Sequence, residues 1–291
     1  MRLKKLLPGL ILLFIIHSCA TQQLINEGNT AYQEGNYDSA LTAWDQAIEI
    51  YQEKGKKADA AVYFNAGRAA MEVEQYERAG NYLSVAYYLQ YDDPALYTLQ
   101  AEIYNTIDNL SKEMTALESY LEKYPGGEKN DAFTVRLFET YVESKNWQWA
   151  ADLWPNINQE ARSTEKLLTS YLVVQKQLGN ADKSTQLAAQ LLKMNANNLE
   201  ALEWFAKSNF KKAEDLYVNE MKAYKNNRTT KQYKRLLKKL DIAYEDYRTS
   251  RDYFLKLYKL SPKSEYAKYL GDIYTRLAQK KKAAYYYKKA Q

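Results

Sequence analysis

The sequence predicts an all-α fold, a superhelix of antiparallel helical hairpins, and three observations support this. Apolar residues recur at helical spacing along most of the chain. Helix breakers are rare, with 10 Gly and 5 Pro in 291 residues, of which 46% are hydrophobic. A pattern of small and aromatic residues also returns at a regular interval. Its clearest copy consists of Gly28, Gly35, Tyr37, Ala40, Trp44 and Ala47.

The interval between copies is close to 34 residues. It is 39 residues from Gly28 to Gly67 and 34 residues from Gly67 to Ala101. The later copies hold Gly67, Tyr76, Ala79, Leu83 and Ala86, then Ala101, Tyr104, Leu110, Leu117 and Pro125, then Tyr141, Trp147, Ala150 and Trp154, and last Gly271, Tyr274, Ala283, Tyr287 and Ala290. This pattern resembles the tetratricopeptide repeat (TPR), which implies a surface that binds other proteins. The alternative is an irregular helical bundle rich in Ala and Tyr.

Small residues in this pattern have a physical reason. Two helices can approach closely only where a side chain is absent or is a methyl group, so Gly28 and Ala40 are expected where the first two helices cross. Large residues such as Trp44 would fill the space toward the next hairpin.

Residues 1–18 are predicted to be a lipoprotein signal peptide. A basic start precedes an apolar run from Leu6 to Ile16, which is too short for the ~20 residues of a membrane span. The following Ile16-His17-Ser18-Cys19 resembles the lipobox of bacterial lipoproteins, with His17 in place of the usual small or aliphatic residue. The resemblance implies cleavage before Cys19 and attachment of diacylglycerol to its thiol, with palmitate as an expected acyl chain. The alternative is an ordinary secreted protein.

The same resemblance implies a location. Ala20 follows the cysteine, and no acidic run follows Ala20, which in related lipoproteins favours the outer membrane and its periplasmic side. Helical spacing resumes at Leu24, so Ala20 to Gln23 are expected to be the only spacer between the lipid and the fold.

Catalysis is not expected. Cleavage removes His17, the only histidine, and acylation uses Cys19, the only cysteine. His-assisted nucleophiles and the usual ligands of zinc or haem would then be missing, so no cofactor and no metal site is predicted. Asp92-Asp93 is interpreted as a turn before a helix.

The elements can be placed in order. Five hairpins are expected at 22–54, 58–91, 94–124, 130–160 and 163–195. Helical spacing then continues without Gly or Pro through most of 199–260, which favours two long antiparallel helices, each on the order of 40 Å. The alternative is two short hairpins split near Asn209 and Thr249. The predicted domains are residues 19–198 with five TPR-like hairpins, 199–262 with the long helix pair, and 263–291 with a last hairpin.

Charge is divided unequally along the chain. Residues 19–202 hold 15 Lys/Arg and 26 Asp/Glu, a net charge of −11, whereas residues 203–291 hold 23 and 10, a net charge of +13. A basic region speeds association with anionic partners. The lipid signal argues against nucleic acid, which leaves acidic protein segments, anionic wall polymers or lipid headgroups. A simple solvated face of lysines is the alternative.

The inner face of the hairpins is the predicted binding surface. TPR co-chaperones hold a C-terminal carboxylate with two asparagines and several cations. Here Asn29 and Asn65 match the asparagines, but Ile25, Ala95 and Leu99 stand at cation positions, so this mode is not predicted. The candidate partner-binding residues are Asn26, Asn29, Tyr32, Phe64, Asn65, Arg68, Glu102, Asn105, Arg136 and Glu139. Trp149 and Tyr286 are predicted exposed anchors for a partner.

Tyr285, Tyr286 and Tyr287 cannot all point inward, and only four residues follow them. We therefore expect a partner helix or a second copy to dock on the C-terminal hairpin, rather than the long helices to cap it. The predicted function is a non-catalytic scaffold for protein–protein interaction. The alternatives are a component of an outer-membrane protein assembly complex and a binder of anionic cell-wall polymer through the basic C-terminal region.

Overall fold

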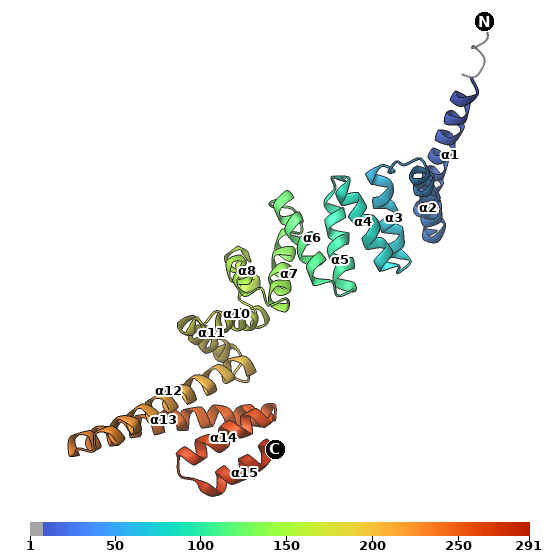
Figure 1. Cartoon of the computed structure of the whole chain (residues 1–291). Helices are drawn as coiled ribbons and strands as arrows, with labels where there is room; N and C mark the ends of the chain where they lie inside the picture. The colour runs from blue at the N-terminus through green and yellow to red at the C-terminus, as the bar shows by residue number, and fades with distance from the viewer. Residues whose placement is uncertain (1–7) are drawn as a thin grey trace. The chain divides into compact units, whose positions relative to one another are not determined.

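A computed structural model describes the backbone of residues 8–291 and the side chains from Ala20 onward (Figure 1). Every regular element in this range is helical, which confirms the all-α prediction. The chain divides into two compact units, one ending at Ser144 and the other running from Lys145 to Gln291.

Paired antiparallel helices make up the first unit. Its helices are α1 (Pro8–Gln33), α2 (Tyr37–Glu53), α3 (Ala60–Glu72), α4 (Tyr76–Tyr88), α5 (Pro94–Thr106), α6 (Leu110–Lys123) and α7 (Asn130–Glu143). Helices α1 and α2, α3 and α4, and α5 and α6 form hairpins, and each hairpin packs on the next. The first three predicted hairpins are therefore confirmed. The expected spacer from Ala20 to Gln23 is wrong, because these residues continue α1 and Thr21 is already buried.

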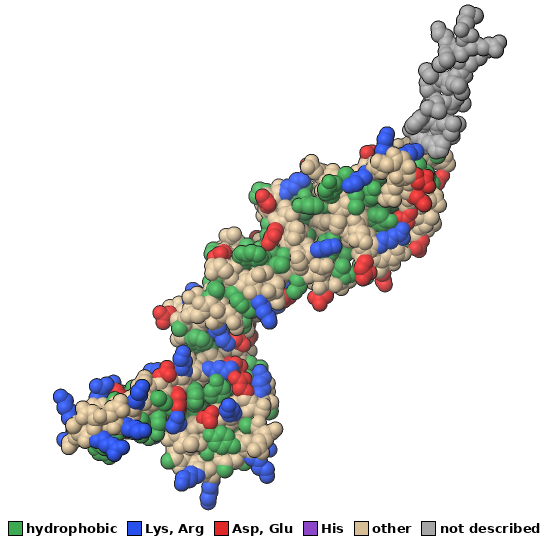
Figure 2. Space-filling model, in the orientation of Figure 1, with side chains coloured by type: hydrophobic (Ala, Val, Ile, Leu, Met, Phe, Trp, Pro, Cys, Tyr) green, Lys and Arg blue, Asp and Glu red, His purple; other side chains and the backbone are tan. Residues whose placement is uncertain are grey.

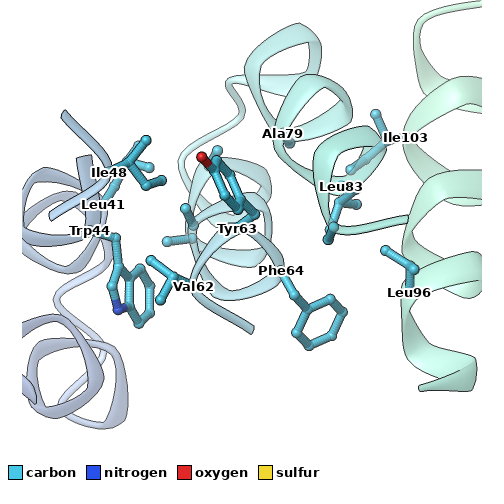
Figure 3. Packing of buried hydrophobic residues seen from close by; sticks show 14 of the residues in the cluster. Leu41, Trp44, Ile48, Val62, Tyr63, Phe64, Ala79, Leu83, Leu96 and Ile103 are labelled. Atoms are coloured by element: carbon cyan, nitrogen blue, oxygen red, sulfur yellow. The ribbon is translucent and has the colours of Figure 1, made fainter. Parts of the chain in front are cut away.

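Helix crossings in the first unit lie at the expected small residues. A Cβ atom added to Gly28 would lie 2.6 Å from Nε1 of Trp44, and one added to Gly67 would lie 2.6 Å from Cδ2 of Leu83. Ala40 has no exposed surface. Figure 3 shows Trp44 of α2 facing Val62 of α3, so the large side chain fills the space between two hairpins.

Turns between paired helices repeat one hydrogen-bond pattern. The Asn36 amide donates to the Ala31 carbonyl over 2.8 Å, and the Gln75 amide donates to the Ala70 carbonyl over 2.8 Å. The residue before each donor adopts a left-handed conformation, with φ of 76° at Gly35 and 59° at Glu74. This is a common way to satisfy the last carbonyls of a helix and reverse the chain.

The second unit combines short and long helices. They are α8 (Trp147–Leu153), the 3-10 helix η1 (Trp154–Asn156), α9 (Gln159–Arg162), α10 (Glu165–Gln177), α11 (Ala181–Met194), α12 (Leu199–Asn226), α13 (Thr230–Leu260), α14 (Ser264–Arg276) and α15 (Lys280–Ala290). The fourth predicted hairpin is divided between the units, because α7 belongs to the first and α8 to the second. Pro155 interrupts α8 after seven residues, and the ring of Trp154 stacks on Tyr171 of α10 at 4.0 Å.

The two long helices are confirmed. They contain 28 and 31 residues, or ~42 and ~46 Å at ~1.5 Å per residue. Their contact repeats every seven residues through small side chains, with Ala206 and Ala213 on α12 and Ala243 and Ser250 on α13, all fully buried. The Ser250 hydroxyl donates to the Ala206 carbonyl over 2.7 Å, which requires the two backbones to lie close together. A seven-residue repeat is typical of coiled-coil packing.

The last hairpin joins α14 and α15, and a Cβ atom at Gly271 would lie 2.6 Å from the Tyr287 ring. One expectation about it is wrong, and docking of a partner on it stays a prediction. Tyr286 is half-buried rather than exposed, stacked on Tyr274 at 5.5 Å and edge-on to Tyr258 of α13 at 6.0 Å. The long helix α13 thus covers this part of the hairpin. Tyr285 and Tyr287 are the exposed rings, because α15 can turn only one face inward.

Candidate functional site

The first unit contains a groove between α3, the start of α5, the end of α6 and the turn before α7. Its lining residues are Phe64, Arg68, Asp93, Pro94, Ala95, Thr98, Leu99, Tyr120, Tyr124, Gly127, Glu128 and Lys129. We call it the Arg68 groove. Two predicted site residues, Phe64 and Arg68, lie in it. Ala95 and Leu99, which stand at the cation positions of the co-chaperone motif, make part of its surface apolar.

Aromatic rings form the base and one wall of the Arg68 groove. Phe64 is buried and stacks on Tyr91 with ring centres 4.4 Å apart. Tyr120 packs edge-on to Phe133 at 4.7 Å, and Tyr124 lies 5.5 Å from Tyr120. Such pairs hold rings in fixed orientations. Part of the groove lining is therefore aromatic and apolar.

Arg68 lies near two aromatic rings, Phe64 of the groove lining and Tyr32 outside it. Its guanidinium carbon is 4.5 Å from the centre of the Tyr32 ring and 5.7 Å from that of Phe64. Burial raises the pKa of Tyr32, and the nearby Arg68 charge partly opposes that rise. Arg68 forms no ion pair with any residue that the structure describes, although it lies in the acidic part of the sequence. A cation in this position can receive a carboxylate or carbonyl oxygen from a ligand.

The turn that closes the groove depends on two glycines. Gly126 has a φ of 79°, a left-handed conformation that glycine adopts without strain. A Cβ atom at Gly127 would lie 2.8 Å from Oη of Tyr120, so only glycine leaves room for that ring. The Lys129 amide donates to the same Oη over 3.2 Å. The turn and the Tyr120 wall are thus fixed against each other.

Tyr124 is held by a second contact. Its hydroxyl donates to Asp92 over 2.9 Å, and Nζ of Lys123 lies 2.9 Å from the same carboxylate. Burial, and then the hydrogen bond to Asp92, raise the pKa of Tyr124 to about 12. The phenol is neutral at physiological pH, as that of an unperturbed tyrosine is, and its ring lines the groove.

Three other predicted residues meet in a separate cluster around Arg136. Its guanidinium donates to Glu113 at 2.6 and 2.9 Å, to Glu143 at 2.9 Å and to Asn105 at 2.9 Å, and Glu139 lies 3.9 Å away. Glu113 is only 1% exposed. These bonds, led by that to Glu113, raise the pKa of Arg136. Asn105, Arg136 and Glu139 lie together, but Arg136 is bonded to Asn105 and to the carboxylates around it, and a role for the three in binding a partner stays a prediction.

The remaining predicted residues are dispersed. Asn26, Asn29 and Glu102 are exposed and Asn65 is half-buried. Asn26 lines a shallow polar hollow along α1 and accepts a hydrogen bond from Gln22 over 3.2 Å. A role for these four in binding a partner stays a prediction.

Of the two predicted anchors, only Trp149 is exposed, at 56% of its surface. Its role in binding a partner also stays a prediction. The predicted lipid site, Cys19, lies among residues whose side chains the structure does not describe.

Sequence reasoning missed Tyr120, Tyr124 and Lys129. It considered only the first helix of each hairpin, whereas these residues lie on the second helix of the third hairpin and on the turn after it. A signal was present, because Tyr124-Pro125-Gly126-Gly127 is the sharpest break in the first half of the sequence.

No helix among the described residues is both long enough and apolar enough to cross a membrane. Within the same residues, no three His, Cys, Asp or Glu side chains gather closely enough to hold a metal ion.

No protein-family model matches the sequence, and a search of the curated proteins finds no match. Solved structures do match. A Bacteroides ovatus protein, proposed in its description to bind proteins, is 18% identical with a TM-score of 0.51, and the match covers 76% of this chain and 98% of that one. The C-terminal part of a TPR repeat-containing protein from Cytophaga hutchinsonii is 13% identical with a TM-score of 0.47, covering 91% and 93%. The first likeness shows the fold, which is TPR-like as the repeat spacing predicts.

Proposed function

We propose that this chain is a non-catalytic scaffold that holds an extended segment of a partner protein in the Arg68 groove. The observation that supports this most directly is the Arg68 guanidinium, which lies over aromatic rings at the groove without an acidic partner among the described residues. Arginine and aromatic side chains are enriched among the residues that contribute most to binding in protein interfaces.

The groove surface indicates what such a segment would need. Leu99 and the Tyr124 ring offer contact to an apolar side chain, while Arg68 offers charge-assisted hydrogen bonds to an oxygen. Asp93, Glu128 and Lys129 also line the groove, so its lining carries both signs of charge. The proposed ligand is therefore a segment with one apolar anchor and an acidic or carbonyl oxygen close to it.

We also propose that lipid on Cys19 anchors the scaffold in a bacterial envelope, at the periplasmic side of the outer membrane. The lipobox resemblance and Ala20 support this proposal. One or more acyl chains would anchor the chain because each buried methylene contributes ~0.8 kcal/mol. The first hairpin would then lie close to the membrane, because Thr21 is already part of the folded α1.

A displayed peptide library tests the groove. Peptides are selected on residues 20–291, a range that contains every residue of the hydrophobic clusters of both units. Their affinity is then measured for the original chain and for Arg68→Gln. We expect a loss of at least about tenfold, because one charge-assisted hydrogen bond contributes ~1.5–3 kcal/mol.

Lys56→Gln provides the matched control, since Lys56 is an exposed cation of the same unit outside the groove. The groove proposal is wrong if both variants bind the selected peptides equally well. It is also wrong if Leu99→Asp, which places an anion on the groove wall, leaves binding unchanged.

Metabolic labelling with an alkyne fatty acid tests the anchor independently. The original chain should become labelled and Cys19→Ala should not. Equal labelling of the two chains would exclude Cys19 as the lipid site without affecting the groove proposal.

A further inference from the structure

The end of the long helix pair is a basic surface that no function described so far uses. We define the helix-pair tip as residues 218–240, the end of α12, the turn and the start of α13. It contains eight Lys or Arg residues and one acidic residue, Glu220. In Figure 1 the pair projects past α14 and α15, and Figure 2 shows Lys and Arg side chains gathered over its free end.

The tip contacts little besides itself. The hydrophobic cluster that joins α12 to α15 reaches Tyr217 on one long helix and Ala243 on the other, and extends no further toward the tip. Beyond that point the helices are joined by the buried Leu236, by a ring contact between Tyr224 and Tyr233 at 5.6 Å, and by Arg235, which donates to Glu220 over 2.8 and 3.1 Å.

Apolar side chains are exposed among these cations. Val218 is 46% exposed, Met221 39%, Tyr233 46% and Leu237 45%. Lys222, Lys225 and Arg228 surround an open hollow with Met221 and Tyr224. The tip thus combines apolar side chains that water solvates poorly with cations of which, among the described residues, only Arg235 forms an ion pair.

We propose that the helix-pair tip binds an anionic lipid surface, with the lysines at the headgroups and Met221 and Leu237 at the boundary of the acyl chains. Surfaces that combine basic side chains with exposed apolar ones bind membranes in this way. Long lysine stems can lie along the apolar region while the ammonium stays with the phosphates. The three cations around the open hollow are suited to contact lipid phosphates.

Two other occupants fit less well. The tip has a net charge of +7, from eight cations and one anion. A second copy of the tip would therefore be repelled. A surface that binds an acidic protein would be expected to be rich in arginine, because arginine is enriched and lysine depleted in protein interfaces. Six of the eight cations here are lysines.

Vesicle binding tests the proposal with residues 20–291, which lack the apolar leader and retain both hydrophobic clusters. The chain should bind phosphatidylcholine vesicles that contain phosphatidylglycerol and should not bind vesicles of phosphatidylcholine alone. Lys222→Gln/Lys225→Gln should weaken binding about 25-fold, at roughly fivefold for each lysine at an anionic surface. Added salt should weaken binding as well.

The matched control is Lys281→Gln/Lys288→Gln, which removes the same charge from exposed positions of the last hairpin. It should change binding less than about twofold. An equal loss in both double variants would overturn the tip as the site, because net charge alone would then explain binding.

A probe distinguishes lipid from acidic protein. Residues 20–291 contain no cysteine, so Leu237→Cys can carry a single environment-sensitive fluorophore, with Gln186→Cys on α11 as the control. The emission from position 237 should shift to the blue on anionic vesicles, and the emission from 186 should not. The lipid proposal fails if position 237 shows no shift, or if polyglutamate binds equally tightly with the same dependence on Lys222 and Lys225.

Discussion

The short hairpins of the first unit and the long pair α12–α13 bury their helices in different ways. In the first unit the two helices of a hairpin approach closely at a small residue, as at Gly28 against Trp44 and at Gly67 against Leu83. The large side chains of one hairpin pack against the next hairpin. In the long pair, small residues return every seven positions, from Ala206 to Ala213 and from Ala243 to Ser250. A hairpin with one close crossing depends on neighbouring hairpins for its stability. Two helices that pack along a continuous seam stabilise each other, so they can extend beyond the neighbouring helices.

The cations differ between these regions for the same reason. In the first unit, Arg136 lies within a stack and is bonded to Glu113, Glu143 and Asn105. At the helix-pair tip, Lys222 and Lys234 are exposed and form no ion pair among the described residues. A carboxylate buried within the stack, such as Glu113, needs a compensating cation, whereas the exposed lysines of the projecting end stay available to a ligand.

The largest expected effect comes from breaking the buried pair of the first unit. Arg136→Met leaves the Glu113 carboxylate buried without its partner, which should lower the free energy of unfolding by ~3–5 kcal/mol. Hydrogen exchange measured by mass spectrometry should show lost protection in α5, α6 and α7. Helices α12 and α13 should keep theirs, since they belong to the other compact unit.

The double variant Arg136→Met/Glu113→Leu serves as the control. It removes the uncompensated charge and should recover most of the lost stability. If the double variant is as unstable as the single one, the loss comes from packing and not from the buried carboxylate.

The second unit should respond to pH through Glu214. Burial alone raises its pKa, but hydrogen bonds from Arg276 and Tyr247 outweigh burial and lower the pKa below its usual value. A lowered pKa stabilises the fold above the unfolded value of about 4.3, and the stabilisation is lost as the pH falls through the folded value. Glu214→Gln should cost ~1.5–3 kcal/mol at neutral pH, because a hydrogen bond to a charged group is lost.

Denaturant unfolding at several pH values checks this expectation. The difference in stability between Glu214→Gln and the original chain should shrink as the pH falls through the lowered pKa of Glu214, where the original carboxyl also becomes neutral. A difference that stays constant with pH would assign the effect to packing.

Much of the fold could be predicted from the sequence because helix crossings and long helix pairs require particular residues at regular spacing. Gly28, Gly67 and Gly271 stand at fixed positions in the repeat, and each lies against a large side chain in the structure. The long pair was predicted because no Gly or Pro interrupts its helical spacing where a turn was expected. Periodicity states which face of a helix is buried, but not which neighbour covers it.

The missed features are those that depend on that neighbour. The sequence predicted an exposed Tyr286, whereas Tyr258, 28 residues earlier, packs against its ring. The Arg68 groove joins residues from Phe64 to Lys129, and its Tyr120 wall depends on the close approach of Gly127. No local pattern specifies contacts between such distant residues.

The crossing in the first hairpin should tolerate little added volume. Ala40→Leu places three more carbon atoms where the side chain has no exposed surface, so we expect a loss of ~1–3 kcal/mol in the free energy of unfolding. Ser39→Leu, at the exposed neighbouring position, should change stability by less than ~0.5 kcal/mol. Equal denaturation midpoints for the two variants would mean that Ala40 does not lie at a tight crossing.

The smallest effect is expected at the helix-pair tip, where the seam no longer determines stability. Leu237 is 45% exposed, so Leu237→Gln removes little buried apolar surface and should change the free energy of unfolding by less than ~0.5 kcal/mol. The same substitution should weaken binding to anionic vesicles, because it removes an apolar side chain from the proposed lipid boundary. Thermal melts and vesicle binding of one preparation can be compared directly. If Leu237→Gln lowers both stability and vesicle binding, Leu237 has a structural role and the lost binding follows from unfolding. If it lowers vesicle binding alone, Leu237 belongs to the lipid-binding surface at the end of the long helix pair.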